Sequence, residues 1–410
     1  SMAIVNNPFI VGGYLSPHYF CDREVETEQL IRNITNGRNV VIISVRRMGK
    51  TGLIRHCFYQ DEIKEHYYTF FIDIYATASL REFVFALGKE IFEKLKPKGI
   101  KFIERFFSVI SSLRAGFKLD SVTGEPTFDI GLGDIHTAET TLDEIFAYLE
   151  QADKPCIVAI DEFQQIGNYT EKNVEAILRT KVQHCQNARF IFAGSQKHIM
   201  MNMFNSPARP FYQSVNMMQL KSIPLTAYRA FVERLFLENK KRIEEELIDE
   251  VYNFFEGHTW YVQLMFNELY ILTGKGEVCD RSLQSIALTN ILQMQDFTYQ
   301  EIFSRLPEKQ KEVLIAIGKE QKATGVTSGK FIKKYKLSTP SSVQAALKGL
   351  LEKNLVSQEQ NQYEIADYLN VSEEFLIEAI STYRSKYGVC TTIDNYTIYF
   401  IPSLGVMKIL

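Results

Sequence analysis

The chain has 410 residues, which is too long for a single hydrophobic core of ordinary size. We therefore expect two or three domains. Hydrophobic residues make up 46% and charged residues 23%, a balance that excludes an intrinsically disordered chain. The formal net charge of -3 gives no overall attraction to nucleic acid or to an anionic membrane, so any such contact would need a local patch.

The six cysteines lie far apart and form no CxxC pair. That distribution is not typical of a zinc site, and scattered thiols favour a reducing compartment. No run approaches the ~20 apolar residues of a membrane span, and no apolar h-region precedes a cleavage site near the N-terminus. We therefore expect a cytoplasmic protein without a membrane partner.

The first half of the chain alternates two kinds of segment. Apolar, β-branched runs predict buried strands, at 39–45, 67–74, 156–160 and 188–194. Amphipathic stretches between them predict helices, at 53–59, 79–95 and 139–151. The Thr123-Gly124 pair predicts a hairpin over 116–132. Strands that alternate with helices imply a parallel sheet with crossover helices.

Strand signals stop past about residue 224. Residues 226–299 predict successive amphipathic helices with a turn at Glu256-Gly257-His258. A different pattern follows, with helices at 308–319, 328–335 and 340–353 and then a short hairpin through Tyr363-Glu364-Ile365. Pro340 suits the first position of the third helix. This order is that of a winged helix-turn-helix.

We expect four regions from these patterns. The first, 1–224, contains the parallel sheet, and 225–300 forms an all-helical region. The winged helix occupies 301–367. The extension 368–410, with one amphipathic helix and a strand-like segment at 396–401, has no role that its pattern indicates.

The octapeptide Ser44-Val45-Arg46-Arg47-Met48-Gly49-Lys50-Thr51 lies between a buried strand and a helix. It matches the Walker A pattern GxxxxGK[ST], with Ser44 in place of the first Gly, whose Cβ would restrict the first turn. Backbone N–H groups in such a loop point at phosphate oxygens, the lysine bridges the β- and γ-phosphates, and the hydroxyl binds Mg²⁺. Candidate nucleotide-binding residues are Arg47, Met48, Gly49, Lys50, Thr51 and Gly52. A chance GK[ST] tripeptide is the alternative, and the strand-loop-helix context argues against it.

Two carboxylates, Asp161 and Glu162, end the strand at 156–160. About 110 residues after a Walker A loop, the first is expected to hold Mg²⁺ and the second to orient or deprotonate the attacking water. A solvated turn would be the alternative for such a pair taken alone. Ser195, at the end of the strand at 188–194, could contact the γ-phosphate or the water, or could simply begin a turn.

With these elements in order, the sequence resembles the archaeal-type ATPase family, a branch of the AAA+ ATPases close to the signal-transducing (STAND) NTPases. FCDREVE (20–26) is similar to the family's FxGRExE entry, and SVRRMGKT (44–51) to its GPRRxGKT loop. The segments IDEFQ, AGSQKHIM and GHTWYVQ, at 160–164, 193–200 and 257–263, also match. The resemblance covers roughly residues 7–366.

The resemblance implies a P-loop AAA+-type parallel sheet with helices on both faces, then a helical lid and a winged helix. Phe20 and Arg23 would line the adenine pocket, and His258 would meet the nucleotide. Asp161 would be the Walker B acid, Glu162 the catalytic glutamate, and Ser195 the sensor residue, with ATP or ADP and Mg²⁺ as cofactors. Ser44, Asp22 and Thr259 depart from the family pattern, where Gly, Gly and Pro stand.

Several side chains have weaker claims. Arg209 is the candidate catalytic arginine and Arg179 its rival, although for each a structural salt bridge is the favoured interpretation. Asp73 could join the Mg²⁺ shell or cap a helix. His258 is more often a packed or capping histidine than a nucleotide sensor.

The winged helix has an ambiguous charge pattern. Its third helix carries only Lys348 and Lys353, and the wing has no positive charge, whereas a basic patch of Lys330, Lys333, Lys334 and Lys336 precedes that helix. We favour an intramolecular or protein-contact role for the winged helix, with DNA as the alternative ligand. The function expected is Mg-dependent ATP binding and slow hydrolysis that drives a conformational switch. The alternative is an ATP-gated DNA-binding regulator without significant catalysis.

Overall fold

The computed structural model describes residues 5–45, 47–128, 137–320, 322–353, 355–359 and 362–365, and strand segments at 392–393, 396–401 and 406–409. Its contacts divide the chain into two compact units. The α/β unit is Gly13–Lys221, and the helical unit comprises the described parts of Ser1–Gly12 and Ser222–Leu410. The chain therefore passes twice between the units. The amphipathic helix expected in 368–410 lies outside the described residues.

A five-stranded parallel sheet forms the centre of the α/β unit, in the order β2-β5-β6-β1-β7. The strands are β1 (Val40–Ile43), β2 (Tyr68–Asp73), β5 (Cys156–Asp161), β6 (Ala188–Gly194) and β7 (Asn216–Gln219). The sequence predicted the first four. It missed β7 because this edge strand is short and partly exposed, and so lacks a continuous apolar run.

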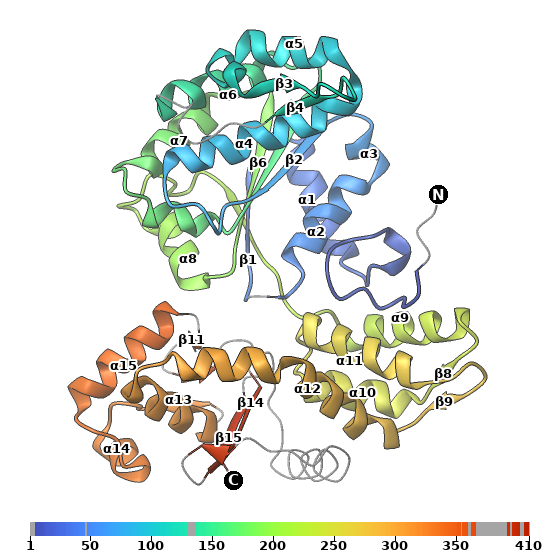
Figure 1. The fold of residues 1–410 in the computed structure, drawn as a ribbon, viewed down its shortest axis with the longest axis vertical. Coiled ribbons are helices and arrows are strands. Elements are labelled where there is room, and N and C mark those ends of the chain that lie inside the picture. The colour runs from blue at the N-terminus through green and yellow to red at the C-terminus, as the bar shows by residue number, and fades with distance from the viewer. Residues whose placement is uncertain are drawn as a thin grey trace. The chain divides into compact units, whose positions relative to one another are not determined.

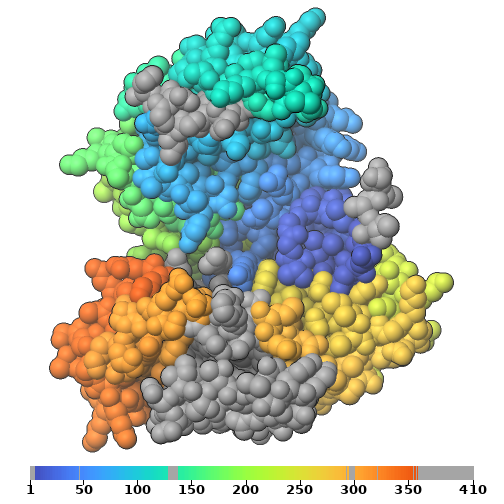
Figure 2. All heavy atoms as spheres, viewed as in Figure 1, coloured from blue at the N-terminus to red at the C-terminus, as the bar shows by residue number. Residues whose placement is uncertain are grey.

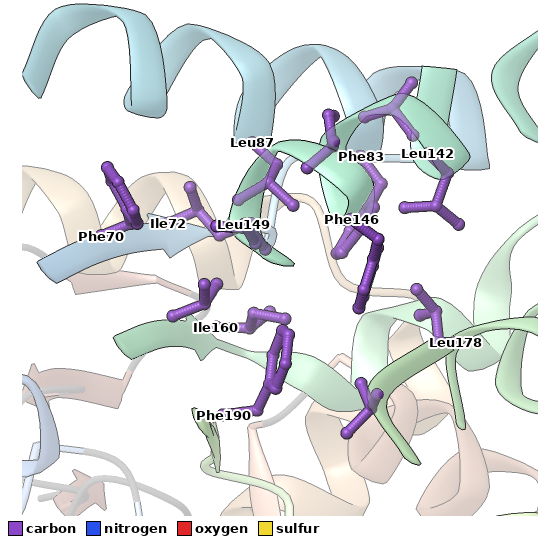
Figure 3. Close-up of a cluster of buried hydrophobic side chains, with 14 of the residues drawn as sticks. Phe70, Ile72, Phe83, Leu87, Leu142, Phe146, Leu149, Ile160, Leu178 and Phe190 are labelled. Atoms are coloured by element: carbon purple, nitrogen blue, oxygen red, sulfur yellow. The ribbon is translucent and has the colours of Figure 1, made fainter. Parts of the chain in front are cut away.

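Alternating side chains of the strands supply two cores, one on each face of the sheet. Val41 and Ile43 of β1 join one core, whereas Val40 and Ile42 join the other. The larger core packs under α4 (Leu80–Leu95) and α6 (Ala138–Gln151), and Figure 3 shows part of it. The smaller core packs under the helices α1 (Glu24–Thr35), α2 (Lys50–Tyr59) and α3 (Asp61–Lys64). Figure 1 shows helices on both faces, which confirms the predicted fold class.

The connection between α4 and α6 carries an additional layer. Helix α5 (Ile100–Val109) buries Phe106 and Phe107 in the larger core, and the hairpin of β3 (Phe117–Leu119) and β4 (Pro126–Phe128) follows it. The hairpin was predicted and α5 was not. In Figures 1 and 2 this layer lies at the top of the view, on the outer surface of the unit.

Two further helices complete the α/β unit, both beside strand ends. Helix α7 (Val174–His184) precedes β6, and α8 (Lys197–Asn205) follows it. The larger core takes Leu178 from α7 and Met200 from α8, so both helices pack on the face that α4 and α6 also cover.

Successive helices occupy the region 226–299, where the sequence predicted them. They are α9 (Leu225–Glu238), α10 (Glu245–Phe254), α11 (Thr259–Leu272) and α12 (Ser282–Ser304). Glu256 and Gly257 have φ of 51° and 71° and make the expected turn before α11. Two short strands, β8 (Arg242–Ile243) and β9 (Val278–Cys279), pair in parallel, so the expectation that 226–299 contains helices alone is wrong. Helix α12 runs continuously across the boundary expected at 300/301.

The winged helix is present in the predicted order. It consists of the helices α13 (Glu308–Glu320), α14 (Gly329–Tyr335) and α15 (Pro340–Glu352) and a three-stranded antiparallel sheet, whose first strand lies between α13 and α14. Its strands are β10 (Ala323–Thr324), β11 (Val356–Glu359) and β12 (Gln362–Ile365). Pro340 is the first residue of α15, and the Thr339 hydroxyl accepts from the Ser342 amide at 3.3 Å.

The expected strand at 396–401 is β14 (Tyr396–Ile401), which pairs with β13 (Thr392–Ile393) and β15 (Val406–Ile409). Over the described residues, no helix is both long enough and apolar enough to cross a bilayer.

The N-terminal residues form a strap on the helical unit that the sequence did not reveal. Phe9 is fully buried and contacts the rings of Phe231, Phe236, Phe266 and Tyr270, with centroids 5.6–6.1 Å apart. Asn267 Nδ2 donates to the Phe9 carbonyl at 2.7 Å, and Asn7 Nδ2 donates to the Asn267 carbonyl at 3.0 Å. The strap therefore completes the core of α9 and α11 from a segment far away in the sequence.

Replacing Phe9 with alanine should destabilise the helical unit by about 3–5 kcal/mol, because a fully buried aromatic side chain leaves a cavity. Hydrogen exchange of α9 and α11 in the full chain measures this loss. Leu237→Ala on α9 is the matched control, since that side chain is 60% exposed and should cost little. Equal protection in the two variants would show that the strap does not complete this core.

Candidate functional site

The loop between β1 and α2 has the backbone of an anion cradle. Arg47 has φ of 63° and Gly49 has φ of 93°, so the chain turns sharply on both sides of Met48. Gly49 is the N-cap of α2, which places the helix amides just after the turn. Ser44 is buried, is not among the residues with positive φ, and its hydroxyl donates to the Val45 carbonyl at 2.9 Å. The first position therefore has no need of glycine here.

The two candidate metal ligands meet although their strands are not neighbours. The Thr51 hydroxyl, in the first turn of α2, donates to Asp161 Oδ2 at 2.9 Å. Strand β6 lies between β1 and β5, so the loop reaches across the end of β6 to make this bond. Parallel strands bring their carboxyl ends to one edge, which is where ligands bind in open α/β sheets.

Glu162 stands beside this pair in a constrained backbone, with φ of 55°. Its Oε2 accepts from the Ser195 hydroxyl at 2.9 Å and also from the Gln164 amide. The structure therefore brings together Glu162 and Ser195, both named from sequence. Sequence reasoning missed Gln164, although its place two residues after Glu162 in the IDEFQ segment was a usable signal.

Asp73 adds a third carboxylate, because it is in register with Asp161 across β2 and β5. Partial burial, followed by the charges of Asp161 and Glu162, raises the pKa of Asp73. Its Oδ1 accepts from the Tyr75 amide at 2.9 Å. Asp73 does not cap the next helix, since the N-cap of α4 is Ser79, which accepts from the Glu82 amide. That alternative for Asp73 is wrong.

Lys50 is the cation that faces this cluster. Its side chain is buried, and its charge opposes the rise in the Asp73 pKa. Among the residues that the structure describes, none accepts a hydrogen bond from its ammonium, so its three donors remain for a ligand. A buried ammonium is costly unless an anion compensates it. The cradle and this lysine therefore fit a phosphate group.

The oxygen donors also fit Mg²⁺. The metal prefers octahedral oxygen ligation and usually takes only one or two carboxylates, with phosphate and water as its other ligands. Thr51 and Asp161 supply two such oxygens at the cradle, and Asp73 a third nearby. Over the described parts of the chain, no cluster of three or more His, Cys, Asp or Glu forms a complete cage. The arrangement thus suits a metal that arrives with phosphates.

Phe20 packs on α2 rather than standing free. Its ring lies so close to Gly52 that an added Cβ would be 3.2 Å from Cε2. It stacks on His56 with centroids 4.4 Å apart, and Tyr14 OH lies 2.8 Å from His56 Nδ1. His56 and Tyr14 are further side chains of this region that sequence reasoning did not name.

Arg23 is buried and donates to the main-chain carbonyls of Met48 and Lys221. Asp22, the preceding residue, has φ of 49°, so it adopts the left-handed conformation for which the family pattern uses Gly.

The remaining predicted residues lie elsewhere. Arg209 makes a two-pronged ion pair with Glu175 of α7, which agrees with the favoured structural interpretation. The Nε of Arg179, also on α7, is buried without a partner in the described structure. His258 belongs to the helical unit, where it is the N-cap residue of α11 and its ring packs on Tyr261. Thr259 takes the first helical position, where the family pattern has Pro.

Comparisons with known proteins agree with this geometry. A family model described as an ATPase domain predominantly from Archaea matches residues 20–265, and a model of a probable winged helix domain matches 297–371. No curated protein matches the chain.

Solved structures share the fold at low sequence identity. The Walker-type ATPase PABY2304 of Pyrococcus abyssi is 19% identical, with a TM-score of 0.59, and the match covers 88% of this chain and 97% of that one. The Aeropyrum pernix ORC2 protein, solved as ADPNP-ADP complexes, is 13% identical over 93% and 98%, with a TM-score of 0.56. The Aeropyrum pernix ORC1 protein in complex with DNA is 12% identical over 92% and 96%, with a TM-score of 0.50.

At these identities the likenesses show the fold alone, whereas the ATPase model spans more than half of the sequence. The chain therefore belongs to the family of ATPase domains found predominantly in Archaea, and it carries a winged helix domain at its C-terminal side.

Proposed function

We propose that this chain binds Mg-ATP at the loop of residues 44–51 and hydrolyses it slowly. The observation that carries the proposal is the hydrogen bond between Thr51 and Asp161, beside a Glu162 that Ser195 and Gln164 hold. Membership of the ATPase family supports nucleotide binding, and the arrangement of these side chains supports catalysis.

Each residue has one role in this proposal. The amides after Met48, with Lys50, hold the phosphates, and Thr51 and Asp161 hold the metal ion. When bound, Mg²⁺ supplies positive charge that neutralises the phosphate oxygens. Glu162 orients the attacking water and accepts its proton. Because two donors occupy Glu162 Oε2, water must use Oε1 or replace one of them, which suits a slow reaction.

The neighbours of the adenine and the role of Arg209 are assigned by the same reasoning. Phe20, Arg23 and Gly52 lie where α1 and α2 begin, so the aromatic surface of Phe20 and His56 is the proposed neighbour of the adenine. Arg209 would have to leave Glu175 before it could stabilise a transferring phosphoryl group. His258, the N-cap residue of α11, is the residue of the helical unit proposed to meet the nucleotide.

The proposed output is a switch in the packing of the helical unit against the α/β unit. The chain passes between the units at 12/13 and again at 221/222, so any change in their arrangement must act on both connections. Gly12 and Gly13 provide backbone freedom at the first of these. A protein that senses the helical unit is the proposed partner.

Lys50→Ala should abolish nucleotide binding, and Glu162→Gln should preserve it while slowing phosphate release about 100-fold. The lysine provides binding energy in the ground state, whereas the glutamate acts only in the chemical step. Calorimetry with Mg-ADP and single-turnover phosphate release separate the two effects.

Glu125→Gln, on the exposed tip of the β3–β4 hairpin, is the matched control and should behave as the wild type. If wild-type protein released no more phosphate than Lys50→Ala, under several salt and partner conditions, the proposal of catalysis would be wrong.

Asp73→Asn should stabilise the free protein at pH 7 and should not do so in acid. The folded chain raises the pKa of Asp73, so the ionised carboxylate costs stability above that raised value. Well below the ordinary pKa of an aspartate, the carboxyl is protonated in both the folded and the unfolded state, and the cost disappears. Asparagine keeps an acceptor for the Tyr75 amide.

Unfolding midpoints of both proteins without Mg²⁺, measured from pH 3 to pH 8, test this expectation. The gap between variant and wild type should widen as the pH rises. A gap that is constant over the whole range would contradict the electrostatic explanation.

A second candidate function, DNA binding, rests on charges of α14. Lys330, Lys333 and Lys336 are exposed, and no hydrogen bond or ion pair holds them within the described part of the chain. Three other lysines of the winged helix are engaged, since Lys334 pairs with Glu320, Lys348 with Glu352, and Lys353 with Gln310. Lys330 and Lys333 of α14, with Lys336 as its C-cap residue, present three exposed charges that favour a polyanionic ligand.

If duplex DNA binds there, replacing these three lysines with glutamine should weaken binding and flatten the salt dependence. Three phosphate contacts give a slope of about -3 in log K against log salt concentration. The control is Lys309→Gln with Lys311→Gln on α13, where both lysines pair with glutamates. Binding with no salt dependence, or equal in both variants, would argue against the DNA function.

A further inference from the structure

Arg23 makes contacts that its expected place in an adenine pocket does not explain. Its side chain is 2% exposed, and its Nη2 donates to the Met48 carbonyl at 3.0 Å. Its Nη1 donates to the Lys221 carbonyl and pairs with Glu26 Oε1 at 3.1 Å. One buried guanidinium therefore joins the phosphate loop to the end of the strand β7 segment.

The contact with Met48 has a consequence for the cradle. A planar trans peptide directs its C=O and its N–H to opposite sides. The described residues contain no cis peptide, so fixing the Met48 carbonyl on Arg23 aims the Gly49 N–H away from Arg23. That amide is one of the donors available to a phosphate. Arg47 and Gly49, on either side of Met48, both have left-handed backbones. Few other backbone conformations are accessible from this geometry.

The contact with Lys221 reaches the second passage between the units. Lys221 is the last residue of the α/β unit, and Ser222 is the first residue of the helical unit after it. Just before this point the Leu220 amide donates to the Ile43 carbonyl at 2.8 Å, which continues the pairing of β1 with β7. The pairing with β1 thus ends at Leu220, and the next residue, Lys221, is the one whose carbonyl Arg23 binds.

We propose that Arg23 is a positioning residue that couples the phosphate loop to the connection at 221/222. The inference rests on the proposed function, because the coupled event is the binding of phosphate to the loop. An anion that accepts from the Gly49 N–H fixes the Met48 peptide, and the same guanidinium then fixes the Lys221 carbonyl. Phosphate binding thereby orders the start of the chain that leads into α9.

The guanidinium is suited to this role and an ammonium is not. Arginine presents its donors in one rigid plane, so two acceptors on it cannot move independently. A lysine at this position keeps the charge but has a compact head that serves one carbonyl at a time. Because the guanidinium is buried, water cannot readily replace a carbonyl that it loses, and the unpaired donor would cost free energy. The Arg23→Lys variant thus separates coupling from charge.

Hydrogen exchange of the full chain with and without ADP tests the proposal. In wild-type protein, ADP should protect both 47–53 and 219–224, and pyrophosphate alone should protect the same two segments while adenosine does not. In Arg23→Lys, saturating ADP should protect 47–53 but not 219–224, and ADP affinity should fall about tenfold because one cradle donor is no longer aimed. Glu26→Gln, which leaves both carbonyl contacts intact, should behave as the wild type.

The outcomes distinguish the two levels of the argument. If Arg23→Lys shows the wild-type protection of 219–224, the coupling is wrong while nucleotide binding stands. If wild-type protein shows protection at 47–53 alone, with ADP or with pyrophosphate, the coupling is again wrong, and this result needs no variant to fold. If ADP protects neither segment, the proposed nucleotide site fails together with the coupling.

Discussion

The hydrogen bond from Thr51 to Asp161 joins the start of α2, which follows β1, to the end of β5. These two strands are not neighbours, and the rest of the site depends on this bond. The loop must cross the end of β6 to reach Asp161. Gly194 ends that strand, and a Cβ there would lie 2.5 Å from Gln164 and 2.6 Å from Met200. The same close packing holds Gln164 against Glu162. The closely packed end of β6 therefore supports both the crossing of the loop and the position of Glu162, the proposed catalytic glutamate.

The charges around this crossing favour a ligand of a particular kind. Asp73, Asp161 and Glu162 gather at one sheet edge, and the ammonium of Lys50 opposes their charge. Burial raises the pKa of Asp73, and repulsion from Asp161 and Glu162 adds to the rise. A bare phosphate would add to this repulsion, and a bare divalent cation would leave the Lys50 ammonium without an anion. A metal and a phosphate together satisfy both halves of the site, so each is expected to bind better in the presence of the other.

Local patterns in the sequence predicted most of the α/β unit and the chemistry at its strand ends. Strands β1, β5 and β6 are apolar runs followed by polar residues, so Lys50, Asp161 and Ser195 could be placed at one edge before their distances were known. The order that puts β6 in the middle was not accessible, because register and neighbours depend on packing across the whole sheet. The contacts of Phe9 and Arg23 could not be predicted for the same reason. Their partners lie far along the chain, in the aromatic core of α9 and α11 and at Lys221, and no local pattern encodes such contacts.

Backbone strain gathers where the proposed chemistry takes place. In the part of the chain that the structure describes, nine residues other than glycine have positive φ, and four of them, Asp22, Arg23, Arg47 and Glu162, adjoin the cradle or Glu162 itself. Each such residue costs on the order of 1 kcal/mol relative to a relaxed backbone, and it persists only because surrounding contacts fix it. The two cores on the faces of the sheet and the buried Arg23 provide those contacts. Because the Met48 peptide is held by the same arginine as the Lys221 carbonyl, relief of strain at the loop cannot remain local. The fold thus links the energy of the phosphate site to the chain that leaves it, whatever the helical unit then contacts.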